Sequence, residues 1–128
     1  MINIKTSKIL IPFLFALILL VLLYKFCFLH IRVSDDYYIQ QKPFTNNYIL
    51  YSHRQGKILE NIYEWKETDK YIYGSGYKNQ DFYYWYEKER NDLLIFSNLH
   101  DFYQKLDSLN LVYTMDNCTR IIDYKTIN

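Results

Sequence analysis

The sequence predicts an α+β fold, with one N-terminal transmembrane helix followed by a small antiparallel sheet of four to six strands and one main packed helix. Three observations support this prediction. Residues 9–29 are apolar except for one lysine, and residues 37–96 alternate short β-prone segments with turn residues. A later stretch carries apolar residues at helical spacing, namely Leu99, Phe102, Leu106 and Leu109.

The apolar stretch Ile9–Leu29 is interpreted as a transmembrane anchor. A spanning helix needs about 20 apolar residues across roughly 30 Å of hydrocarbon. The uninterrupted run Ile9–Tyr24 is short for this, so the predicted span extends through Lys25, whose long stem can carry its charge to the headgroups. The residues assigned to the anchor are Ile9, Pro12, Phe15, Leu20, Tyr24, Lys25 and Leu29.

The residues around this stretch favour an uncleaved signal anchor over a cleaved signal peptide. A cleavage site needs small residues, and residues 24–28 are bulky. Residues 1–8 form a basic leader with Lys5 and Lys8, which is expected to be cytoplasmic. The sequence therefore predicts a single-pass protein of the inner (cytoplasmic) membrane, with the lipid bilayer as a first partner and an extracytoplasmic domain.

The charge is distributed unevenly along the chain. The net charge is +1, but residues 1–33 carry +4 and residues 34–128 carry −3. An acidic domain argues against a nucleic-acid partner, because such domains are usually basic. The two cysteines, Cys27 and Cys118, lie in the anchor and in the domain, so no disulfide within the domain is expected.

A juxtamembrane link is expected over residues 30–36, and an aromatic-rich domain over 37–128. Its strands are expected at residues 37–39, 48–51, 62–66, 71–74, 81–87 and 93–96. Gly74–Gly76 is expected to break a strand, and Leu93–Phe96 to be buried. In the strongest strand, Phe82, Tyr84 and Tyr86 share one face, and Tyr83, Trp85 and Glu87 share the other.

Two helices are expected after the strands. Ser97 or Asn98 can cap the first, and Asp101 in its first turn complements the helix dipole. Residues 117–125 are expected to form a short final helix that turns Cys118, Ile121 and Ile122 inward.

No residue pattern predicts a catalytic site, a cofactor site or a metal site, and no small-molecule substrate is indicated. The histidines His30, His53 and His100 lack metal-ligand spacing. The carboxylates are scattered, and Gly74–Gly76 lies between strands, not before a helix as a phosphate loop requires. The sequence therefore favours a protein without enzymatic activity.

Aromatic density is the unusual feature of the domain. Tyrosine and tryptophan are favoured anchors of protein interfaces. The candidate partner interface consists of Tyr71, Tyr73, Tyr83, Trp85 and Glu87. The alternative is that tyrosine replaces other apolar residues on a half-exposed sheet, and the sequence leaves both interpretations open.

The architecture resembles small membrane-anchored immunity proteins, with which bacteria neutralise exported toxins. The resemblance rests on the anchor Ile9–Leu29, the strand pair Tyr71–Gly74 and Phe82–Tyr86, and the helix with Phe102 and Leu106. It implies a non-enzymatic protein-binding protein that blocks a toxin at the membrane. The alternatives are an accessory subunit of a membrane protein complex and a small extracytoplasmic enzyme.

Overall fold

The computed structural model describes residues 4–27 and 29–126, and the side chains of 8–23 and 29–124. A four-stranded sheet follows the N-terminal helix α1 (Ile4–Cys27); its strands are β1 (His30–Arg32), β2 (Tyr37–Gln41), β3 (Tyr48–Ser52) and β4 (Gly56–Leu59). A five-stranded sheet is built from β5 (Ile62–Glu67), β6 (Tyr71–Lys78), β7 (Gln80–Glu87), β8 (Asp92–Phe96) and β9 (Thr119–Arg120). The remaining helices are α2 (Leu99–Ser108) and α3 (Ile121–Thr126).

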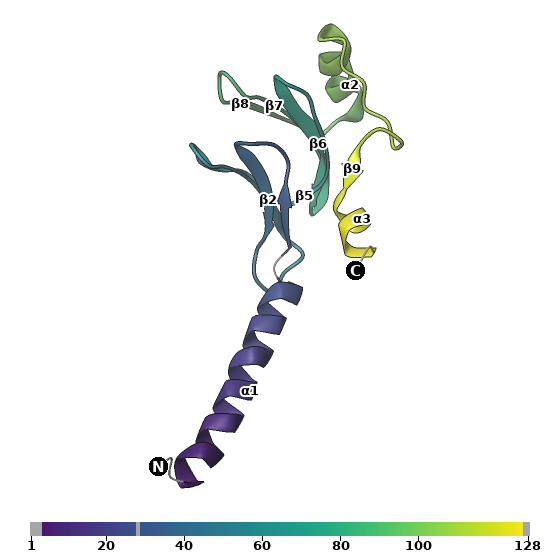
Figure 1. Cartoon of the computed structure of the whole chain (residues 1–128). Helices are drawn as coiled ribbons and strands as arrows, with labels where there is room; N and C mark the ends of the chain where they lie inside the picture. The colour runs from purple at the N-terminus through teal and green to yellow at the C-terminus, as the bar shows by residue number, and fades with distance from the viewer. Residues whose placement is uncertain (1–3, 28, 127–128) are drawn as a thin grey trace.

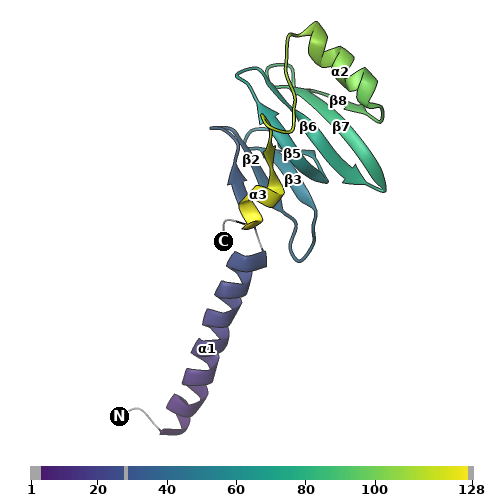
Figure 2. The same cartoon turned by 90° about the vertical axis from the view of Figure 1, so that its right-hand side faces the viewer.

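The domain has three layers, and the five-stranded sheet is the middle one. The strand orders are β1-β2-β3-β4 and β8-β7-β6-β5-β9, with antiparallel neighbours throughout. One face of the five-stranded sheet packs on the four-stranded sheet, and α2 covers the other face (Figures 1 and 2). Both faces of the middle sheet are therefore apolar.

Strand β7 joins the two cores because its side chains alternate between them. Tyr84 and Tyr86 are buried between the sheets, together with Ile39 and Leu50 of the four-stranded sheet. Trp85 is buried on the opposite face. The predicted alternation along this strand is confirmed, since a period of two follows directly from strand geometry.

The second core lies beneath α2. Phe102 and Leu106 of the helix are fully buried against Tyr73 and Trp85 of the sheet. Asn98 caps α2 by accepting a hydrogen bond from the His100 N–H at 2.7 Å, which confirms one of the two predicted caps.

The predicted fold class is wrong in two respects. The first concerns the sheet, because the described residues form two sheets with nine strands in place of one sheet with four to six. Three strands escaped prediction because they are only two to four residues long: β1, β4 and β9. β1 lies inside the predicted link, so residues 30–32 belong to the folded domain.

The second correction concerns the predicted transmembrane helix. Within the part of the chain that the structure describes, no helix combines the length and apolarity that crossing a membrane requires. α1 ends at Cys27, and Leu29 packs against the core between the sheets, so the helix does not continue to the predicted end of the span at Leu29. Lys8 also lies inside α1, and the uninterrupted apolar run from Ile9 falls short of about 20 residues.

This finding contradicts the single-pass anchor, the inner-membrane localisation and the extracytoplasmic placement that depended on it. Of the residues assigned to the anchor, Ile9, Phe15 and Leu20 are exposed on α1. Pro12 lies inside this helix. The predicted roles of the Tyr24 and Lys25 side chains lie outside the described side chains.

Gly74 and Gly76 do not break a strand but lie within the continuous strand β6. A Cβ atom at Gly74 would collide with the backbone carbonyl of Glu64, and one at Gly76 with that of Asn61. The irregularity lies in β5 instead, between Ile62 and Glu64. The glycines therefore permit a close approach of two strand backbones.

Candidate protein-binding groove

The most accessible apolar strand of the domain is β8, which forms an edge of the five-stranded sheet. In the described part of the chain it pairs with β7 on one side only. Leu94 and Ile95 are 42% and 57% exposed. The prediction that residues 93–96 form a buried strand is therefore wrong for its two central residues. An edge of this kind offers unpaired backbone groups to another chain.

A groove lies beside this edge, between β8 and β4. Its volume is about 470 Å³, and its apolar lining comes from β4, β7 and β8, namely Ile58, Leu59, Phe82, Leu93 and Ile95. Ile58, Leu59, Phe82 and Leu93 are only partly buried where the core between the sheets reaches the surface. We call this feature the β4–β8 groove.

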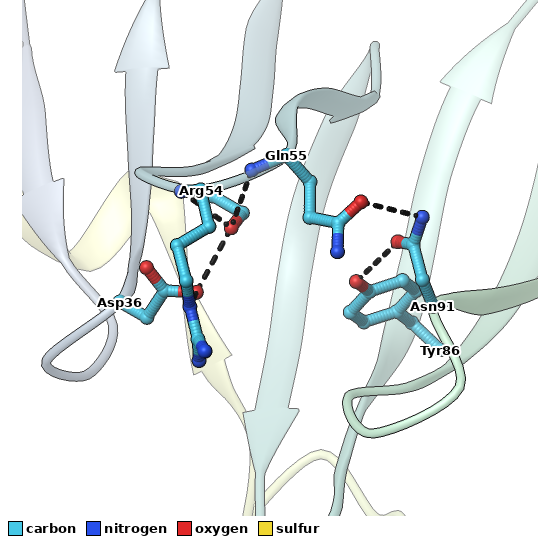
Figure 3. Close-up of polar contacts among 6 residues, drawn as sticks. Asp36, Arg54, Gln55, Tyr86 and Asn91 are labelled. Carbon is cyan, nitrogen blue, oxygen red and sulfur yellow. Dashed lines mark hydrogen bonds and ion pairs between the residues drawn. The ribbon is translucent and has the colours of Figure 1, made fainter.

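A small hydrogen-bonded network, the latch, holds together the starts of β4 and β8, two of the strands that line the groove. It consists of Gln55, Tyr86 and Asn91 (Figure 3). Asn91 Nδ2 donates to Gln55 Oε1 at 2.9 Å, and Asn91 Oδ1 accepts from the hydroxyl of Tyr86. Gln55 directly precedes β4 and Asn91 directly precedes β8. The latch therefore fixes the distance between the strands at one end.

The turn before β4 is held by a second set of polar contacts. The buried Ser52 Oγ accepts from the backbone N–H groups of Arg54 and Gln55, and it donates to Asp36 Oδ2 at 2.9 Å (Figure 3). Arg54 Nε donates to the same oxygen at 3.3 Å. Desolvation is the largest single effect on Asp36 and raises its pKa, but the combined hydrogen bonds and charges of its neighbours lower the pKa overall. The groove is therefore preformed on this side.

The polar rim of the groove is predominantly basic. Lys57 and Lys78 line it together with the single carboxylate Glu60, and Lys57 Nζ lies 3.0 Å from Glu60 Oε1. The hydrogen bond from Lys57 and then its charge lower the pKa of Glu60, and Lys42 and Lys78 act in the same direction. Two lysines and one carboxylate therefore lie at this rim, and Lys57 is paired with the carboxylate.

The structure divides the predicted interface residues between the core and its margin. Tyr73 and Trp85 are 1% and 5% exposed, and both lie under α2. Tyr71, Tyr83 and Glu87 are half-buried. Lys105 Nζ on α2 lies 4.5 Å from the centre of a Trp85 ring, a cation–π contact that adds to the packing. Tyr73 and Trp85 can reach a partner only if α2 moves away.

A second cluster brings together a carboxylate, two hydroxyls and a thiol. The Tyr113 hydroxyl donates to Glu64 Oε2, so the Ser75 hydroxyl, 3.1 Å away, donates to Tyr113. Cys118 Sγ donates to the same Glu64 oxygen at 3.6 Å. Burial, followed by Glu64, raises the pKa of both Tyr113 and Cys118. The raised pKa values favour the protonated forms of both groups, and the hydrogen bonds of Tyr113 and Cys118 to Glu64 link residues 113–118 to β5.

The histidines do not converge on a metal site. The rings of His30 and His53 both lie close to the Tyr38 ring, with centroids at 5.0 and 4.6 Å, and His100 lies in the first turn of α2. Among the described residues, no group of three or more His, Cys, Asp or Glu side chains could hold a metal ion.

Comparisons with protein-family models, curated proteins and solved structures find no match for this chain. The resemblance to immunity proteins therefore stays a prediction. The β4–β8 groove is therefore the structural feature on which a function can be proposed. Sequence reasoning did not predict this groove. The relevant sequence signal is the apolar segment DLLIF at residues 92–96, but its exposure follows from its position at the edge of the sheet.

Proposed function

We propose that this protein is a non-enzymatic binding protein that takes up an extended segment of a partner protein along β8. The observation that carries the proposal is the open edge of β8, with exposed Leu94 and Ile95, directly beside the preformed β4–β8 groove. In this mode an added strand pairs its backbone with β8. Its alternate side chains point to opposite faces, so one set enters the groove.

The favourable free energy of binding comes from burial of apolar surface that the unbound domain exposes to water. Ile95 both lines the groove and is largely exposed. Covering such side chains contributes roughly 25 cal/mol per Å² of apolar surface, and the backbone pairing fixes orientation. The latch holds β4 and β8 in place before a partner binds. The conformational entropy lost on binding is therefore smaller.

A toxin-neutralising role and a role as a complex subunit both require a protein partner, and both are compatible with this site. No contact in the described residues favours one over the other. The Glu64–Tyr113–Cys118 cluster gives no support to the alternative of an enzyme, because its hydroxyl and thiol are held in their protonated forms.

Selection from a displayed library of random heptapeptides tests the proposal. We expect the wild-type domain to enrich peptides that lose at least tenfold in affinity for the Ile95→Lys variant, because a charge then occupies the apolar groove. The matched control is Val112→Lys, since Val112 is also a β-branched residue and is 58% exposed, but lies after α2. Hydrogen exchange on peptide addition should slow at the amides of β8.

Two results would overturn the proposal. One is a failure to enrich any peptide over the Ile95→Lys domain. The other is enrichment of peptides that bind both lysine variants equally, which would place the binding surface elsewhere. Circular dichroism of each variant distinguishes a lost interface from a lost fold.

A further inference from the structure

We infer that the binding site extends beyond the β4–β8 groove into a second cavity, which takes up one aromatic side chain of the same partner segment. This inference rests on the proposed function and adds a required residue to the partner. The second cavity has a volume of about 320 Å³ and is lined from β3, β5, β6 and α3. We call it the β5–α3 pocket, with a buried floor and a more accessible rim, formed respectively by Tyr48, Ile62 and Ile121 and by Asn61, Tyr77 and Ile122.

The β5–α3 pocket is adjacent to the groove. Asn61 lines both cavities, and the consecutive residues Tyr77 and Lys78 line one cavity each. The Tyr77 N–H donates to the Asn61 carbonyl at 3.0 Å, so a hydrogen-bonded backbone pair lies at the boundary between the two cavities. A segment that occupies the groove therefore has the β5–α3 pocket next to one of its ends.

The β6–β7 turn determines which end of the segment this is. In the register of β7 and β8, Tyr83 lies opposite Phe96, the last residue of β8, so the turn at residues 78–80 lies beyond that end of β8. The aromatic residue therefore belongs at the end of the segment that lies next to Phe96. It precedes the paired residues when the segment runs antiparallel to β8, and it follows them when the segment runs parallel.

The lining of the β5–α3 pocket matches an aromatic side chain that has a polar tip. The lining is mainly apolar, and none of the described side chains in it carries a charge. A charged side chain would therefore lose its hydration without gaining an ion-pair partner. The Asn61 amide and the Tyr77 hydroxyl supply hydrogen-bonding groups at the rim, which suits the N–H of tryptophan or the hydroxyl of tyrosine.

An aromatic residue in this pocket would also fix the register of the bound segment. Backbone pairing with β8 leaves the register open, because a shift of two residues keeps the same set of side chains toward the groove. The pocket is near the lower limit of roughly 300 Å³ for small-ligand sites, so it holds one side chain and not a longer stretch. Binding energy at interfaces is concentrated in such buried aromatic residues.

The first experiment uses 5-fluoroindole as the probe and follows its fluorine NMR signal with the full chain. We expect the probe to bind the wild type at least tenfold more tightly than Ile122→Glu or Tyr77→Glu, because each substitution places a charge at the rim. Both side chains are largely exposed, so neither substitution removes a buried core residue. Val112→Glu is the matched control, since Val112 is equally exposed and lines neither cavity. Ile95→Lys, which alters the groove, should bind the probe as the wild type does.

The second experiment joins the pocket to the segment and uses the heptapeptides that the wild-type chain enriches. We expect these peptides to carry tryptophan or tyrosine at one end. Replacing that residue with alanine should weaken binding to the wild type at least tenfold. The same replacement should change binding to Ile122→Glu less than twofold, because that variant no longer takes up the ring.

The outcomes separate the inference from the function beneath it. Equal affinity of the wild type and Ile122→Glu for 5-fluoroindole would overturn the inference, and so would probe binding that Ile95→Lys removes. Enriched peptides that lack an aromatic residue but still depend on Ile95 would overturn the inference and leave strand binding intact. A failure to enrich any peptide would overturn the proposed function, and with it the link between this pocket and a segment, whatever the affinity for the probe.

Discussion

β7 and β8 are neighbouring strands of similar apolar character that meet opposite environments. In β7, Tyr84, Trp85 and Tyr86 are at most 5% exposed, because the strand has a neighbour on each side and a layer on each face. In β8, Leu94 and Ile95 remain largely in water. The comparison teaches that position in the sheet, more than side-chain type, decides whether an apolar strand builds the core or offers a surface.

The largest effect should come from Trp85→Ala. Trp85 lies directly opposite Leu94 in the β7–β8 register, so the pair compares a buried position with an exposed one in the same row. We expect Trp85→Ala to reduce the free energy of unfolding by about 3–5 kcal/mol, because it leaves a cavity beneath α2. Leu94→Ala should cost only about 0.5 kcal/mol.

Urea denaturation followed by circular dichroism measures both changes. Equal losses for the two variants would mean that α2 does not cover Trp85. Weaker peptide binding by Trp85→Ala with unchanged stability would instead make Trp85 an interface residue, as the sequence left open.

A second effect should appear at alkaline pH and should arise from β7, not from β8. Burial raises the pKa of Tyr84 well above its ordinary value of 10.0, and it also raises that of Tyr86. A group with a raised folded pKa stabilises the fold fully below the unfolded pKa and loses that contribution as pH rises beyond it. Stability should therefore fall above about pH 10.

The ultraviolet absorbance of tyrosinate and far-ultraviolet circular dichroism should then change together across the alkaline transition. Tyr84→Phe removes one phenol and its 2.9 Å hydrogen bond to the Glu64 carbonyl. This variant should be less stable at neutral pH and should lose stability less steeply above pH 10. Gradual ionisation of the tyrosines without unfolding would contradict the prediction.

A smaller effect should come from the latch. Gln55→Ala removes the hydrogen bond from Asn91 and so releases the start of β4 from the start of β8. We expect a loss of about 0.5 kcal/mol in the free energy of unfolding, because the bond is exposed. Hydrogen exchange at the amides of β4 should nevertheless become faster, and peptide affinity should fall. Unchanged exchange in β4 would show that the groove keeps its width without the latch.

The smallest effect should come from Asp36, which holds the turn before β4. Its pKa is lowered in the folded state, so its contribution is present above the ordinary value of 3.8 and is lost as pH falls through the folded pKa. Asp36→Asn should therefore lower stability slightly at neutral pH and make it less dependent on pH in the acid range. Acid titration of the unfolding free energy tests this, and an unchanged acid dependence would exclude a role for the carboxylate.

The parts of the fold that the sequence predicted well are those with strong local signals. The alternation of Tyr83, Tyr84 and Trp85 and the cap at Asn98 depend on neighbouring residues only. The short strands β1, β4 and β9 carry too few residues for a periodic signal, and pairing with distant strands defines them. The end of α1 before Leu29 depends likewise on the core into which Leu29 packs.

The candidate site was harder to predict because it depends on tertiary arrangement. The β4–β8 groove joins residues near 58 with residues near 95, and local periodicity cannot bring them together. The predicted interface residues Tyr73 and Trp85 are aromatic, and aromatic residues are common in protein cores as well as at interfaces. α2, which follows them in the chain, decides their burial.

The pairing of β9 with β5 has a consequence for how the chain folds. Strand β5 receives its second neighbour only from residues 119–120, and Ile121 then enters the core between the sheets. Closing so long a loop is entropically costly and slows folding. Until residues 119–121 have been synthesised and docked, the sheet has four strands, and both β5 and β8 are open edges. During that interval the edge of β5 is open to pairing with another chain.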